Sequence, residues 1–185
     1  MDQEVKEKSM GQTTVIWNVE GQFYQLDNGQ YYDAGFFTYI QGIPDKFLSL
    51  VPQIAFVAEP FNASTNTNGN LTILSFPAGQ FSVFKVPPLP PSFEKPESWL
   101  GLDNPIATYQ RNSTSFAALT SSSGFTTLTF DLIDSRDFTL DGNIYSWNEL
   151  MGKSVTQNGF SAPYPSTQTR DGTTTISSFV GTAFN

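Results

Sequence analysis

The segment FTTLTFDLI, Phe125 to Ile133, carries the clearest strand pattern in the chain. Its apolar and polar side chains alternate, with Leu128, Phe130 and Leu132 on one face and Thr127, Thr129 and Asp131 on the other. Because successive side chains of a strand point to opposite faces, this period of two predicts a half-buried β-strand.

Similar short segments lie on both sides of this strand, and turn residues separate them. Eleven segments carry this signal, and together they predict about eight to ten strands: residues 13–19, 23–26, 31–40, 53–59, 71–76, 81–86, 106–110, 115–120, 125–133, 137–140 and 173–184. Helical patterns do not alternate with them, so we expect an all-β fold. The predicted architecture is a single jelly-roll or β-sandwich barrel of about eight strands.

The connections between these strands carry their own signals. Asp27-Asn28-Gly29 predicts a hairpin turn, because Asn and Gly tolerate positive φ. We expect Gly21 to interrupt the strands around it, residues 61–70 to form a polar loop, and residues 44–52 to hold at most one helical turn. Residues 144–153 are the one segment expected to form a short helix.

The length of 185 residues fits one domain, with residues 1–12 as a flexible arm and residues 13–185 as the barrel. Only 14% of the residues are charged, although 38% are hydrophobic and 15% aromatic. A surface with so few charges suggests extensive contact with other protein surfaces or an unusual solvent.

The net charge of −8 argues against nucleic-acid partners and against anionic membrane surfaces. The chain has no cysteine and no histidine. Thiolate and histidine nucleophile systems, and the usual zinc sites, are therefore excluded. The charged N-terminus does not resemble a signal peptide, and no apolar run has the length of a membrane span. We expect no enzymatic activity, no cofactor and no metal.

Three groups of residues suggest binding chemistry, and each has a structural explanation. The aspartates could hold a structural cation, but solvated loop acids with Arg136 as their partner explain them better. The glutamates could form a glycosidase pair, although nothing brings two of them together. The exposed aromatics of a carbohydrate-binding sandwich could equally fill a core. The three groups are Asp131, Asp134, Asp137 and Asp141; Glu94, Glu97 and Glu149; and Tyr31, Tyr32, Trp147 and Tyr164.

The segment KVPPLPPSFEKPESW, Lys85 to Trp99, is rich in proline and lies between two predicted strands. A PxxP ligand for an SH3-type domain would normally have basic flanks and lie in a tail, and a domain linker would need two cores. We therefore expect a stiff connection that packs on the barrel or on a neighbouring subunit. The expected interface residues are Pro88, Pro91, Phe93 and Trp99.

These features together resemble viral capsid proteins of the single jelly-roll kind. The arm MDQEVKEK lacks the basic charge that would contact a genome, which suits a shell that overlies an internal membrane. In size and acidity the chain is similar to the smaller major capsid protein of haloarchaeal internal-membrane icosahedral viruses. At molar salt a Debye length of roughly 3 Å screens carboxylate repulsion.

The resemblance implies a virion protein that forms capsomers through lateral barrel contacts, with itself or with a larger sister protein. It implies no direct contact with nucleic acid. The alternative is a carbohydrate-binding or receptor-binding β-sandwich, such as a tail-fibre or adhesion module.

Overall fold

The computed structural model describes residues 14–48, 52–112 and 115–185, and for residues 163–168 it describes the backbone alone. The expected N-terminal arm, residues 1–12, lies outside the described residues.

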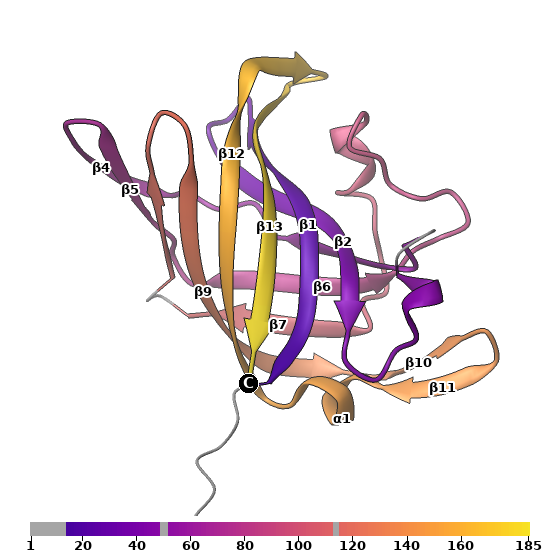
Figure 1. Cartoon of the computed structure of the whole chain (residues 1–185). Helices are drawn as coiled ribbons and strands as arrows, with labels where there is room; N and C mark the ends of the chain where they lie inside the picture. The colour runs from indigo at the N-terminus through magenta and orange to yellow at the C-terminus, as the bar shows by residue number, and fades with distance from the viewer. Residues whose placement is uncertain (1–13, 49–51, 113–114) are drawn as a thin grey trace, which may run out of the picture.

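Eight antiparallel strands close into a barrel (Figure 1). In the order in which they pair, they are β1 (Val15–Leu26), β2 (Tyr31–Ile40), β3 (Ile54–Ala58), β6 (Gly79–Lys85), β7 (Ala107–Arg111), β9 (Gly124–Ser135), β12 (Ser154–Arg170) and β13 (Thr173–Phe184). β13 pairs again with β1, and the pairing of β12 with β9 completes the closure. The predicted all-β barrel of about eight strands is confirmed.

The connectivity differs from the expected jelly roll. Each barrel strand pairs with the barrel strand before it and the one after it in the chain, which is an up-and-down meander. A jelly roll instead contains Greek keys, in which a long connection brings distant strands together. Strand patterns in a sequence do not encode pairing order, so the jelly-roll connectivity was wrong although the fold class was right.

Shorter elements are inserted between the barrel strands. β4 (Ser64–Asn68), β5 (Leu71–Ser75) and β8 (Phe116–Leu119) extend the sheet from the upper half of β9. β10 (Asp137–Leu140) and β11 (Asn143–Ser146) form a separate hairpin, followed by helix α1 (Trp147–Met151). Two single-turn 3-10 helices, η1 (Asp45–Phe47) and η2 (Pro96–Ser98), lie in the connections.

Four local expectations need correction or adjustment. Gly21 does not interrupt β1, because it pairs with Gly35 of β2 and leaves room for the Phe179 ring. The expected loop at 61–70 contains β4, whose side chains are all exposed. The helix predicted at 144–153 is confirmed but shorter, since β11 takes its first residues. β12 was not predicted.

The hairpin turn between β1 and β2 is confirmed. Gly29 has a φ of +82°, and its backbone amide donates to the Leu26 carbonyl at 2.9 Å. The Asn28 side chain accepts a hydrogen bond from the Gln30 amide at 2.9 Å, which fixes the turn further.

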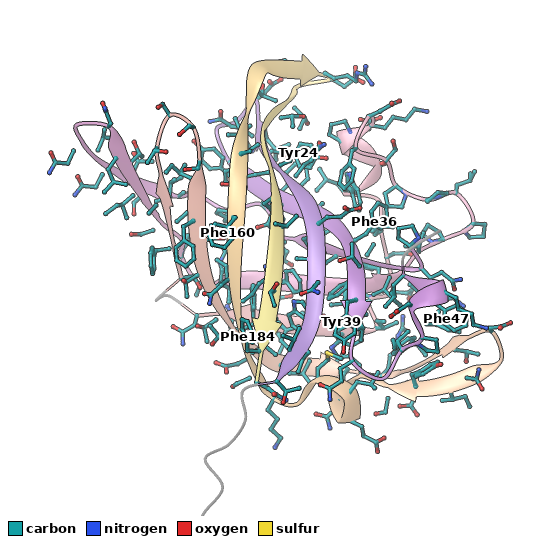
Figure 2. The ribbon with its side chains drawn as sticks, viewed as in Figure 1. Tyr24, Phe36, Tyr39, Phe47, Phe160 and Phe184 are labelled. Carbon is teal, nitrogen blue, oxygen red and sulfur yellow. The ribbon has the colours of Figure 1, made fainter. Side chains whose placement is uncertain are left out.

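The apolar core has two parts. The larger part fills the barrel, and Trp147 of α1 closes its lower end. The centres of the Trp147 and Phe37 rings lie 5.6 Å apart, and Trp147 Nε1 donates to the Tyr109 hydroxyl at 2.8 Å. The smaller part lies between the outer wall of the barrel and the proline-rich segment. Figure 2 shows Tyr24 and Phe36 on this outer side of β1 and β2.

Candidate functional site

A cavity of about 100 Å³ lies in the upper half of the barrel, above the packed lower core. Its walls are mostly apolar and include Phe23, Leu74, Phe76, Leu128, Ile176 and Phe179. A single water needs roughly 10–15 Å³, and a dry engineered cavity of about 150 Å³ binds benzene. The space therefore suits a compact organic molecule.

The cavity exists because β9 has two different neighbours along one edge. Residues 130–135 of β9, in its lower half, pair with β7, and residues 124–127, in its upper half, pair with β8. The sheet therefore divides between these two parts of β9. The extension formed by β8, β5 and β4 contributes Leu74 and Ala117 to the cavity wall. The loop with exposed Thr120 and Ser123 lies at the rim, where the Thr120 hydroxyl accepts a hydrogen bond from the Ser123 amide at 3.1 Å.

Among the described residues that line the cavity, Asp33 of β2 is the one with an ionisable side chain. Its neighbours Tyr32 and Ala34 belong to the smaller part of the core, on the outer wall of the barrel. Because side chains alternate along a strand, Asp33 points into the barrel. Burial raises the pKa of its carboxyl from 3.8 to about 6, although the positive charge of Arg111 and its own backbone amide both lower it. Among the described residues, no cationic group lies within 4 Å of this carboxylate.

Arg111 at the end of β7 supplies the balancing charge at longer range. The residue is 3% exposed, its Nε donates to the Pro77 carbonyl at 3.1 Å, and its guanidinium lies 4.1 Å from the centre of the Phe61 ring. Burial lowers the pKa of Arg111, and the charge of Asp33 partly offsets this. The guanidinium also lies 5.3 Å from the centre of the Phe76 ring, which lines the cavity, and its charge is attracted to the ring faces.

Gln157 of β12 adds an amide to the cavity wall. Its Oε1 accepts a hydrogen bond from Trp17 Nε1 at 2.8 Å, and the residue is 4% exposed. Since the oxygen is engaged by Trp17, the Nε2 group is the end of this amide that remains as a donor. The site thus combines an acidic acceptor and an amide donor with apolar walls.

The expected interface residues lie in the segment that crosses the outer wall of the barrel. Trp99 is 1% exposed, with its ring 4.9 Å from Phe36 and 5.2 Å from Phe93. Pro91 is buried and Pro88 is exposed. The expectation that the segment packs on the barrel through Phe93 and Trp99 is confirmed, and a contact of these four residues with another subunit stays a prediction.

Two of the four aspartates considered for a cation site have separate partners. Asp131 accepts a hydrogen bond from Ser154, and Asp141 forms an exposed ion pair with Lys46 at 3.2 Å. Arg136 donates to the carbonyl of Asn104. Within the described residues, no three acidic side chains form a group that could hold a metal.

The glutamates and aromatics considered for sugar chemistry are not assembled into a site. Glu94 and Glu97 lie in the proline-rich segment, whereas Glu149 is on α1 at the lower end of the barrel (Figure 1). Tyr32 and Trp147 are fully buried, so they are not accessible for stacking on a sugar ring. The side chain of Tyr164 lies outside the described residues.

Asp33, Arg111 and Gln157 were not identified from the sequence. The signal for Asp33 was a carboxylate within the apolar strand YYDAGFFTYI, at residues 31–40. Aromatic residues on both faces of that strand hid which face was the interior.

Comparison with known proteins gave no match to a family model, to a curated protein or to a solved structure. Among the described residues, no helix has the length and apolar character to cross a membrane.

Proposed function

We propose that the protein binds a small, mainly apolar molecule in the upper cavity of the barrel. The observation that carries this proposal is the cavity of about 100 Å³ with mostly apolar walls and a few polar groups. Small-molecule sites characteristically have this composition, and barrel mouths are among their common locations. An eight-stranded barrel is also just wide enough to hold one small ligand.

The two ends of the barrel support the same proposal. The lower end is filled by buried Trp17, Phe37 and Trp147, whose rings contact each other. The upper half keeps open space although apolar side chains surround it. Unfilled volume costs stability, at about 24 cal/mol per Å³ in measured cavity series. A ligand that fills the space recovers those lost contacts.

The test is a titration with toluene, indole and phenol, followed by amide chemical shifts. A cavity-filling variant, Ala117→Phe, places a ring in the cavity, because Ala117 is buried and lines it. The matched control is Ala118→Phe on the same strand, since Ala118 points to the opposite face. We expect binding to wild type and to the control but not to Ala117→Phe. Equal binding to all three folded proteins would place the ligand elsewhere, and no binding to wild type would refute the proposal.

A second candidate is the structural subunit expected from the sequence. An exposed apolar patch on the outer face favours it, because cross-strand partners Phe160 and Val180 are 65% and 58% exposed. Phe160 also contacts Phe125 at 5.4 Å, and Figure 2 shows it on β12. Large exposed apolar side chains that gather in one place commonly mark contact surfaces.

Sedimentation velocity tests this second candidate in low salt and in molar salt. Self-association that Phe160→Ser weakens would support lateral contacts between copies. A wild-type protein that stays monomeric under both conditions would remove the candidate.

A further inference from the structure

The cavity combines one ionisable group with walls that offer that group little compensation. Asp33 is half-buried and lines the cavity, and the hydrogen bond that its carboxylate accepts among the described residues comes from its own backbone amide. A carboxylate that borders a mostly apolar cavity is less well hydrated than one in open water, so its remaining acceptor sites favour a ligand that brings a donor.

The charge around the cavity is already balanced before a ligand enters. The negative charge of Asp33 and the positive charge of Arg111 interact over more than 4 Å, and each shifts the pKa of the other. Among the described lining residues, the remaining polar groups are neutral hydroxyls and the amide of Gln157. A charged guest would therefore add an unpaired charge to a nearly neutral, poorly hydrated space.

We infer that the ligand is a neutral molecule with an apolar body and a hydroxyl group, and that this hydroxyl donates a hydrogen bond to the Asp33 carboxylate. This inference rests on the proposed function and names the chemical class of its ligand. The cavity volume of about 100 Å³ limits the apolar body to about the size of one aromatic ring.

Other ligand classes fit the same groups less well. A carboxylate ligand would be repelled by Asp33. An ammonium ligand would bring a second cation near buried Arg111. A pure hydrocarbon would leave the Asp33 oxygens without a donor, and a buried acceptor that loses its partner carries its full desolvation cost.

The experiment compares phenol with toluene, which have the same shape and differ in one hydroxyl. Calorimetry gives the dissociation constants of both ligands for wild type and for Asp33→Leu. The dissociation constant of toluene divided by that of phenol is then compared between the two proteins. Taking the ratio between proteins removes the difference in hydration of the two ligands. Hydrogen bonds to charged groups contribute enough that we expect the ratio to fall by about tenfold or more in the variant.

The matched control is Ser177→Ala, which removes a different polar group from the cavity wall and should keep the wild-type ratio. If Asp33→Leu does not fold, Asp33→Asn replaces it, with a smaller expected fall because an amide oxygen is a weaker acceptor than a carboxylate.

An unchanged ratio in the Asp33 variant, or a ratio that collapses in Ser177→Ala, would overturn the inference while the proposed function stands. The same holds if benzylamine, added as a cationic ligand of similar size, binds wild type more tightly than phenol. If neither toluene nor phenol binds wild type, the proposed function itself fails.

Discussion

Replacing Asp33 with asparagine should change the pH dependence of stability. In the folded protein the carboxyl has a pKa of about 6, against 3.8 for the ordinary value, and burial is the main cause. Between those two pH values the folded state keeps a proton that the unfolded state releases. The free energy of unfolding therefore falls as the pH rises from about 4 to about 6, and the full loss is present above that range.

The size of this effect follows from the pKa difference. At about 1.4 kcal/mol per unit, a rise from 3.8 to about 6 corresponds to about 3 kcal/mol at pH 7. Asparagine resembles the protonated acid in shape and carries no charge at any pH. The free energy of unfolding of Asp33→Asn minus that of wild type should thus increase by about 3 kcal/mol from pH 3.5 to pH 7.5. Arg111 is present in both proteins.

The assay is urea unfolding of both proteins at pH 3.5, 5 and 7.5, because carboxyl groups common to both cancel in the difference. Asp141→Asn is the matched control, since Asp141 forms an exposed ion pair and asparagine also tolerates its positive φ. Its difference from wild type should stay within about 1 kcal/mol. A constant difference for Asp33→Asn, or one that favours wild type as the pH rises, would refute the reasoning.

Two further predictions concern packing. Trp99→Ala should lower the free energy of unfolding by about 3–5 kcal/mol, because the Trp99 ring is buried against the barrel, whereas Leu100→Ala at a 45% exposed side chain should change it by less than about 1 kcal/mol. Similar values for the two variants in urea unfolding would contradict this. Gly35→Ala should cost about 3 kcal/mol, since the added Cβ would lie 2.0 Å from the Glu20 carbonyl oxygen, and a thermal midpoint equal to wild type would contradict it.

The positions of several strands were predictable from the sequence. Residues 31–40 and 173–184 match β2 and β13 at both ends. The signal of residues 173–184 comes from the alternation of side chains, and that of residues 31–40 from the turn at Asp27-Asn28-Gly29 that precedes them. These local features depend only on which face of a strand meets the core.

β12 was not predictable for a physical reason. Its sequence, Ser154–Arg170, includes Gly159 and Pro163, which weaken a strand pattern. Its place in the sheet comes instead from backbone pairing, of residues 154–161 with β9 and of residues 156–163 and 168–170 with β13. The meander order was also missed, because pairing order depends on the closure of the whole barrel.

The site was missed because both parts of the apolar core pack against β2. Tyr32 and Ala34 are buried on the outer wall under the proline-rich segment, so β2 is apolar on both faces. Asp33 then appears in the sequence as an isolated polar residue with no assigned side. The sequence did predict that the segment around Trp99 packs on the barrel. Because this packing makes the outer face of β2 apolar as well, the pattern of β2 does not indicate which side Asp33 faces.

Crystals soaked with 4-iodophenol would test the central claim most directly, since the anomalous signal of iodine locates the ligand without reference to the rest of the density. We predict one main iodine peak inside the upper cavity, near Phe76 and Leu128, with the hydroxyl oxygen within hydrogen-bond distance of Asp33. Iodine peaks on the outer surface alone, with the cavity unchanged at saturating ligand, would contradict the account.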